Sequence, residues 1–306
     1  MIIGVPRAFL YYRHNQLWET FFKELGCEVL ISPDTNKALI QTGANHSIDE
    51  SCLSSKIYLG HVEWLIGKCD YILVPRVAAY SGTQIVCSKL WSAYDVVCNI
   101  FRDRNIKILD YNIDYANNKI EFMAFLKMGR KLKKKRFAIV RAYFMAKQAE
   151  KMTHEANVQK QKELLATTDK LKILIVSHAY NIYDSYIGRP ILERLCALDC
   201  IPIIAETVER DAATQIAKEE SPTLKWGYNQ ELMGAVSLYK QDVDGIILLT
   251  AFPCGPDSLV NEIIIRRTKD KPVINLVVDE QDGMAGLETR IESFVDIIRF
   301  RQDMVV

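Results

Sequence analysis

Short apolar runs recur along this chain, and segments with the apolar spacing of amphipathic helices lie between them. The runs cover residues 2–5, 27–31, 71–75 and 106–109 in the first half, and residues 171–176, 200–204, 245–249 and 272–276 in the second. Short buried strands that alternate with helices form βαβ units, in which the strands run parallel. The pattern therefore predicts an α/β protein built on parallel sheets.

The two halves also share their order of elements, which indicates an internal repeat. In each half a cysteine follows the third apolar run and opens a helical pattern, Cys87 in the first half and Cys254 in the second. A chain of 306 residues exceeds the usual size of one domain. Because self-similar halves indicate related units, we predict one α/β domain at residues 1–116 and a second at residues 171–306.

The segment between these domains, residues 117–170, differs in composition. It is rich in Lys, Ala, Glu, Leu and Gln and contains no Pro, which is typical of long helices. We expect it to be helical throughout and to brace the two domains. Its basic run, residues 131–136, is interpreted first as a solvated helix face, and a docking patch for an acidic partner protein is the alternative.

Charge and hydropathy exclude several classes of partner. The net charge of +1 does not indicate nucleic acid or a membrane surface, and no stacking aromatics alternate with the basic run. No apolar run approaches the roughly 18 residues that span a bilayer, and the first residues resemble a strand rather than a signal peptide. We therefore expect a cytoplasmic protein. In that compartment the eight cysteines are not expected to form a disulfide framework, which leaves them available for metal or redox chemistry.

Three cysteines occupy positions that suit ligation. Cys87 and Cys254 are expected at the carboxyl ends of equivalent strands, the edge where open α/β sheets bind ligands. Cys52 lies in a polar loop, residues 47–56, before a helix predicted at 57–65. A helix N-terminus favours thiolate over thiol, so three such cysteines suit a cubane iron–sulfur cluster with one open iron, and zinc is the competing ion. The other cysteines are expected to be core or incidental thiols: Cys27, Cys69, Cys98, Cys196 and Cys200.

Other polar residues are expected near the same sheet edges. His178 and Tyr180 follow the first strand of the second domain, where they are candidate proton donors or simply packed loop residues. Arg7 and Arg76 follow strands of the first domain and either bind an anion or form surface salt bridges. Glu50 is a candidate proton donor or fourth cluster ligand, with an ordinary helix-start acid as the alternative.

Several motifs in these regions match one family pattern. They are the segments 4–8 with Tyr11 and Tyr12, 49–53, 74–76, 178–184, 251–260, 279–280 and 286–294. Together they resemble the uncharacterised domain associated with CoA-enzyme activases. That domain is related to the iron–sulfur subunits of 2-hydroxyacyl-CoA dehydratases and to double-cubane cluster proteins.

The resemblance implies two Rossmann-like domains that grip one 4Fe-4S cluster in the cleft between them. Cys52, Cys87 and Cys254 match the family's cysteine positions. A separate ATP-hydrolysing activase supplies the electrons in the wider superfamily, and this chain has no phosphate loop and hence no expected nucleotide site of its own. It departs from relatives in having Ser54 where Pro is common, in lacking the additional cysteines of a double cubane, and in being shorter than dehydratase subunits.

The leading functional hypothesis is an oxygen-sensitive 4Fe-4S protein of an anaerobe. It accepts low-potential electrons from an activase and reduces a small substrate at an open cluster iron, as a reductase or dehydratase-like component. One alternative is an electron carrier or assembly subunit without its own substrate. Another is a metal-free two-lobed ligand-binding protein. The oligomeric state, including a homodimer, is left open.

Overall fold

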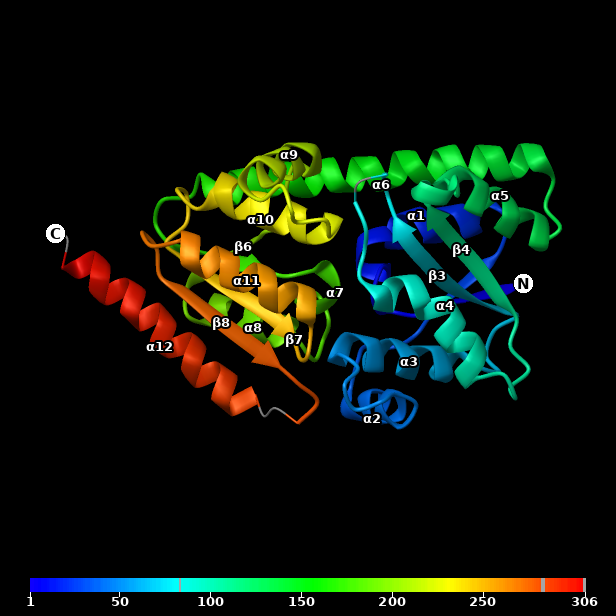
Figure 1. Ribbon diagram of the computed structural model, residues 1–306, viewed down its shortest axis with the longest axis horizontal. Helices are drawn as coiled ribbons and strands as arrows, with labels where there is room; N and C mark the ends of the chain where they lie inside the picture. Colours follow the sequence, from blue (N-terminus) through cyan, green and yellow to red (C-terminus); the bar gives the residue numbers. More distant parts are fainter. Residues whose placement is uncertain (83, 282–283, 305–306) are drawn as a thin grey trace. The chain divides into compact units, whose positions relative to one another are not determined.

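The computed structural model describes residues 1–82, 84–281 and 284–304, and within these ranges it contains two four-stranded sheets (Figure 1). The strand orders are β2-β1-β3-β4 in the first sheet and β6-β5-β7-β8 in the second. Neighbouring strands are parallel in both sheets. The predicted α/β class with two Rossmann-like domains is thereby confirmed.

The chain divides into two compact units. Unit 1 comprises Met1–Glu155 and Lys225–Gly227, and unit 2 comprises Ala156–Leu224 and Tyr228–Val306. The long helix α6 (Arg136–Leu165) contains residues of both units. A separate brace formed by residues 117–170 stays a prediction.

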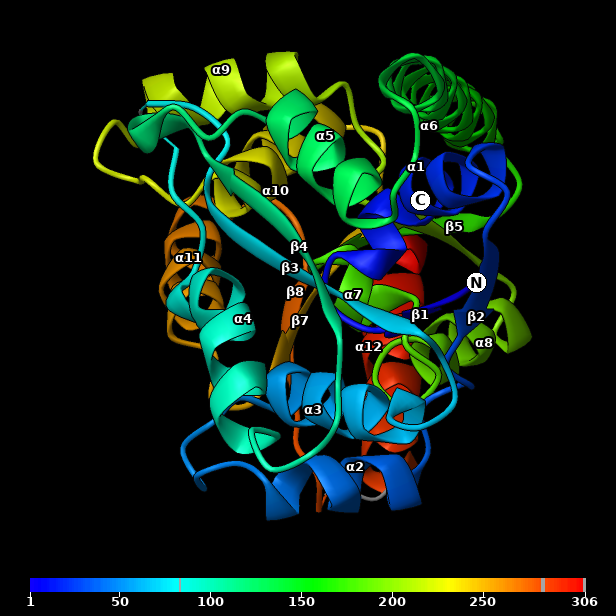
Figure 2. The same cartoon turned by 90° about the vertical axis from the view of Figure 1, so that its right-hand side faces the viewer.

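Unit 1 has helices on both faces of its sheet. Figures 1 and 2 show α3 on one face and α1 and α5 on the other, which explains why the strands are mostly apolar. The strands are β1 (Ile2–Val5), β2 (Glu28–Ile31), β3 (Tyr71–Ala79) and β4 (Ile108–Asp114). The helices are α1 (Tyr11–Glu24), α2 (Lys37–Asn45), α3 (Leu53–Leu65), α4 (Ser88–Ile100), the 3-10 helix η1 (Tyr115–Asn117), α5 (Glu121–Lys131) and the first part of α6.

Unit 2 is built around strand β7, in which every residue is buried. Helix α12 packs closely against the start of β7, because a Cβ on Gly245 would lie 2.5 Å from Ile298 Cδ1. The strands are β5 (Leu171–Val176), β6 (Cys200–Ile204), β7 (Gly245–Ala251) and β8 (Val273–Val278). The helices are α7 (Ala179–Ile182), α8 (Arg189–Ala197), α9 (Arg210–Glu220), α10 (Gly227–Tyr239), α11 (Gly255–Arg267) and α12 (Met284–Asp303).

Several element boundaries differ from the sequence-based expectation, among them the ends of β3, β7 and β8. Helix α3 begins at Leu53 rather than residue 57, so Cys52 directly precedes a helix. Strand β4 continues to Asp114 because its pairing with β3 extends that far. The segment 117–170 is not helical throughout: Lys133 adopts a left-handed backbone with φ of 56° and separates α5 from α6.

Hydropathy gives the same result in the structure as in the sequence. In the described part of the chain, no helix is both long and apolar enough to cross a membrane.

Candidate functional site

Cys52 and Cys87 occupy matching positions in unit 1. Each is the N-cap residue of the helix that follows it, and their backbone angles are nearly the same, with φ and ψ of −62° and 150° for Cys52 and −65° and 152° for Cys87. Both are half-buried. The ammonium of Lys89, in the first turn of α4, donates to the hydroxyl of Ser51 at 3.1 Å. The starts of α3 and α4 therefore lie close together.

Cys254 has the equivalent place in unit 2. It is the half-buried N-cap residue of α11, three residues beyond the end of β7. Because β7 is the third strand of its half and β3 is the third of the other, the strand–cysteine–helix order recurs in both units. Each thiol thus lies where the unpaired N–H groups of a helix favour negative charge.

A buried polar cluster adjoins the first turn of α11. Asp257 is 4% exposed, and one of its oxygens accepts hydrogen bonds from His178 Nε2 and Asn229 Nδ2, each at 2.8 Å. Burial alone raises the pKa of the Asp257 carboxyl. The charge of His178 and hydrogen bonds from His178, Asn229 and Cys254 outweigh burial and hold that pKa below its usual value.

Of the two proton-donor candidates in this region, His178 is the better placed. It is the buried N-cap residue of α7, and its ring stacks on that of Tyr180 with centroids 4.9 Å apart. His178 and Cys254 both interact with Asp257. The structure therefore brings His178 to the same helix start as Cys254, with the ring of Tyr180 stacked on that of His178.

Arg7 and Arg76 are engaged in ion pairs. Arg7 pairs with Asp34, and Arg76 pairs with Asp95. These contacts match the salt-bridge interpretation of both arginines, and the anion-binding role stays a prediction. Glu50 is exposed in the loop before Cys52.

The remaining cysteines mostly have the character expected of incidental thiols. Burial raises the pKa of the thiols of Cys27, Cys69 and Cys200. Cys98 is half-buried, whereas Cys196 is exposed and is therefore not a core thiol. A raised pKa favours the neutral thiol, as expected of a core or incidental cysteine.

The chemistry of the three N-cap thiols suits an iron–sulfur cluster, since cubane clusters bind cysteine thiolates. No disulfide joins any of the eight cysteines, all of which lie in the described ranges. Cys52 and Cys87 belong to unit 1 and Cys254 belongs to unit 2. Among the residues that the structure describes, no group of three or more His, Cys, Asp or Glu side chains is placed to hold a metal ion.

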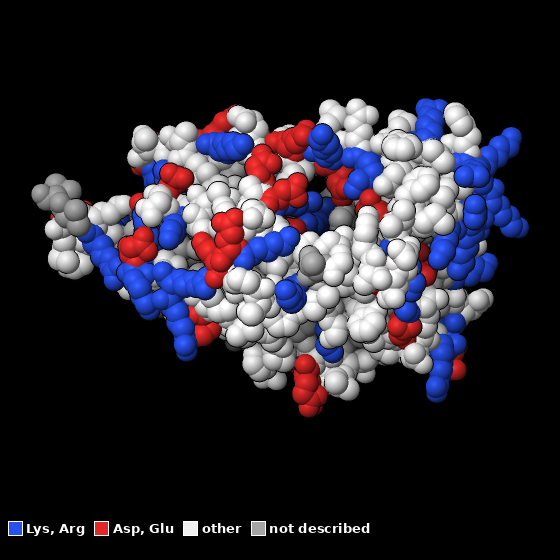
Figure 3. Space-filling model, turned by 45° about the horizontal axis from the view of Figure 1, so that its top comes forward, with Lys and Arg blue, Asp and Glu red and all other residues white. Residues whose placement is uncertain are grey.

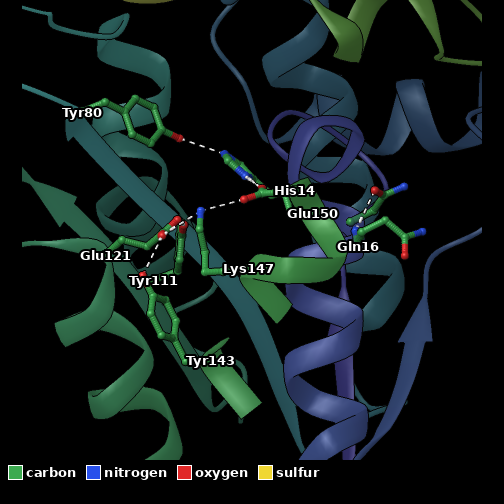
Figure 4. Close-up of polar contacts among 9 residues, drawn as sticks. His14, Gln16, Tyr80, Tyr111, Glu121, Tyr143, Lys147 and Glu150 are labelled. Carbon is green, nitrogen blue, oxygen red and sulfur yellow. Dashed lines mark hydrogen bonds and ion pairs between the residues drawn. The ribbon is translucent and has the colours of Figure 1, made fainter. Parts of the chain in front are cut away.

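A second polar cluster lies in unit 1, around His14 (Figure 4). His14 Nδ1 lies 2.6 Å from a carboxylate oxygen of Glu150, and the ammonium of Lys147 lies 2.7 Å from the other. Lys147 also pairs with Glu121 at 3.1 Å. The hydroxyl of Tyr111 donates to Glu121 at 2.8 Å. These contacts join α1, β4, α5 and α6 through charge, which sequence patterns did not indicate.

The basic run falls at the junction of α5 and α6. Figure 3 shows Lys and Arg side chains gathered at the right of the view, over the end of α5 and the start of α6. Lys133, Lys135 and Arg136 are exposed, as a solvated face requires. The docking patch for an acidic partner stays a prediction.

Comparison with known families places the chain. The model of the CoA enzyme activase uncharacterised domain matches residues 2–208, which is most of the chain. The chain belongs to this family. The match covers nearly all of unit 1 and the start of unit 2, so it includes Cys52, Cys87 and His178 but ends before Cys254.

Other comparisons add little. No curated protein matches the chain in sequence. Among solved structures, the Streptococcus pneumoniae AdcAII protein is similar at 14% identity, with 95% of this chain and 96% of that chain covered and a TM-score of 0.25. A TM-score this low supports no structural or functional conclusion.

Proposed function

We propose that this protein of the CoA enzyme activase uncharacterised domain family is a 4Fe-4S protein whose cluster is held by the thiolates of Cys52, Cys87 and Cys254. It accepts low-potential electrons from a separate ATP-hydrolysing activase and passes them to a small substrate. When bound, such a cluster supplies one-electron transfer and an iron position open to a substrate.

The observation that carries the proposal is the repeated placement of the three thiols. Each cysteine is the N-cap residue of a helix, has an extended backbone and is half-buried. Partial positive charge at the three helix starts offsets the negative charge of thiolates and cluster. None of the five other cysteines is an N-cap residue in the described helices.

The side chains around Cys254 have a supporting role in this proposal. Because His178 donates to Asp257, its Nε2 carries a proton. The acceptor Asp257 lies in the first turn of α11. Asn229 donates to the same carboxylate oxygen, which fixes the carboxylate in place. In this proposal His178 is the proton donor beside the start of α11, and its hydrogen bond to Asp257 orients the ring.

The family name supports an activase as the electron donor. A kinship with dehydratase subunits, and dehydratase-like or reductase chemistry, belongs to the proposal. The carrier alternative differs only in having no substrate of its own. A substrate analogue that changes the spectrum of the reduced protein supports turnover, whereas an electron carrier shows no such change.

Cysteine substitutions test the ligand set. We expect Cys52→Ser, Cys87→Ser and Cys254→Ser each to lose most of the iron bound by the anaerobically purified protein, since a cubane needs its thiolates. Cys98→Ser is the matched control, because Cys98 is also half-buried but lies within α4, and it should retain iron. Full iron content in a Cys87→Ala, Cys254→Ala double variant contradicts the proposal.

A further inference from the structure

Unit 1 contains a cavity of about 330 Å³ between α3, α4 and the loop that follows α2. Helix α4 lines it with Lys89, Ser92, Ala93, Val96 and Ile100, which recur at the three- and four-residue spacing of one helix face. The volume is at the lower end of the roughly 300–1,000 Å³ typical of small-molecule pockets. It suits a ligand far smaller than coenzyme A.

Tyr58 provides a buried donor on the wall of this cavity. Its side chain stacks on Phe9, with ring centroids 4.9 Å apart, and is only 3% exposed. Its hydroxyl oxygen is buried and has no hydrogen-bond partner among the described residues. A buried hydroxyl without a partner costs free energy, which a ligand that accepts its hydrogen bond recovers.

The charge of the lining has one sign. Lys89 supplies an ammonium that donates to the hydroxyl of Ser51, and Ser55 also lines the cavity. No Asp or Glu is among the lining residues in the part of unit 1 that the structure describes. His46, which also lines the cavity, is bonded to Glu63 at 2.6 Å. Farther along α4, Val96 and Ile100 offer an apolar surface. The cavity is thus cationic near the start of α4 and apolar along the helix.

We propose that this cavity binds a small carboxylic acid anion with an apolar body. Lys89 and Ser51 bind the carboxylate, the apolar face of α4 contacts the body, and the Tyr58 hydroxyl donates to a polar atom of the ligand. Ser51 precedes Cys52, and Lys89 lies two residues after Cys87, so the charged end adjoins both cysteines. Assigning the bound acid as the substrate rests on the proposed function, whereas the binding itself does not.

Titration of the full-length protein with hexanoate and with its neutral isostere hexanamide tests this site. Calorimetry should detect binding of hexanoate. Hexanamide should bind about tenfold more weakly because it lacks the charge that Lys89 recognises. The Lys89→Met variant should bind hexanoate about tenfold more weakly than the wild type and should bind hexanamide equally well. Lys37→Met, an exposed lysine outside the cavity, should bind hexanoate like the wild type.

Tyr58→Phe provides a second readout. This variant should bind hexanoate several-fold more weakly, yet the unliganded protein should unfold at the same or a higher temperature, since the unpaired hydroxyl is gone. Absence of hexanoate binding to the wild type at millimolar concentration overturns the proposal, as does equal binding by Lys89→Met. If the protein contains iron but does not bind hexanoate, the proposed anion site is wrong and the proposed cluster stands. If the protein binds hexanoate but contains no iron, the proposed cluster is wrong and the anion site stands.

Discussion

At the scale of single residues, Glu150 is the carboxylate that His14 and Lys147 share in the cluster around His14. Burial alone raises the pKa of the Glu150 carboxyl, but His14 and Lys147 outweigh burial and hold that pKa well below its usual value. Lys147 is affected in the opposite direction: burial lowers its pKa, and Glu150 and Glu121 more than reverse this. The paired charges therefore stabilise each other across α1, α5 and α6.

We expect Glu150→Gln to lower the free energy of unfolding at pH 7 by about 2–4 kcal/mol, because it removes the carboxylate that pairs with buried His14 and with half-buried Lys147. A depressed folded-state pKa contributes stability that is present above the unfolded-state value of about 4.3 and is lost as pH falls through the lower folded-state value. The difference between wild type and variant should thus shrink on acidification to pH 3. Urea unfolding at the two pH values measures it.

Glu155→Gln is the control on the same helix, since Glu155 is exposed and pairs with exposed Lys151 at 3.7 Å. It should change stability by no more than about 0.5 kcal/mol. Equal destabilisation by the two substitutions would show that burial and pairing do not distinguish these carboxylates.

At the scale of elements, α2 and α3 pack backbone to backbone. A Cβ on Gly43 would lie 1.7 Å from the carbonyl oxygen of Lys56, and one on Gly60 would lie 2.1 Å from that of Leu39. Residues 46–51 follow α2, line the cavity in part and lead to Cys52. The position of α2 on α3 therefore also positions the start of the cysteine site.

Gly43→Ala should lower the free energy of unfolding by about 1–3 kcal/mol, because α2 and α3 must separate to admit a methyl group. Gly286→Ala in α12 is the matched control. It meets nothing within 4 Å and should be neutral or stabilise the helix by up to about 1 kcal/mol. Thermal unfolding of both variants checks this, and a wild-type melting temperature for Gly43→Ala would contradict the close packing.

Element prediction succeeded where the pattern was continuous and failed where polar residues are buried. Strands β5 and β6 have the predicted bounds because largely apolar runs define them. The start of α3 was missed because Ser54 and Lys56 are polar yet only 6% and 7% exposed. The apolar run predicts an end at residue 109, but β4 continues beyond it. From Asp110 onward buried residues such as Tyr111 alternate with partly buried polar ones, so the apolar run stops before the strand does.

At the scale of the whole molecule, the repeated strand–cysteine–helix order was visible in the sequence because it depends on local pattern alone. The contacts around the cysteines could not be predicted from the sequence. Asn229 and Asp257 are 28 residues apart, and Ser51 and Lys89 are 38 apart, so only tertiary packing brings each pair together. The sequence around Asp257 gives no sign of its partner His178, which lies 79 residues away in the chain.

Both units contribute cysteines to the proposed ligand set, so the central claim concerns the intact chain. Iron and acid-labile sulfide analysis of anaerobically purified wild-type protein, with electron paramagnetic resonance of the reduced form, tests it most directly. The account predicts a brown protein with roughly four iron and four sulfide per chain and a cubane signal on reduction. A folded, colourless protein without iron or sulfide would contradict it and favour a metal-free ligand-binding protein.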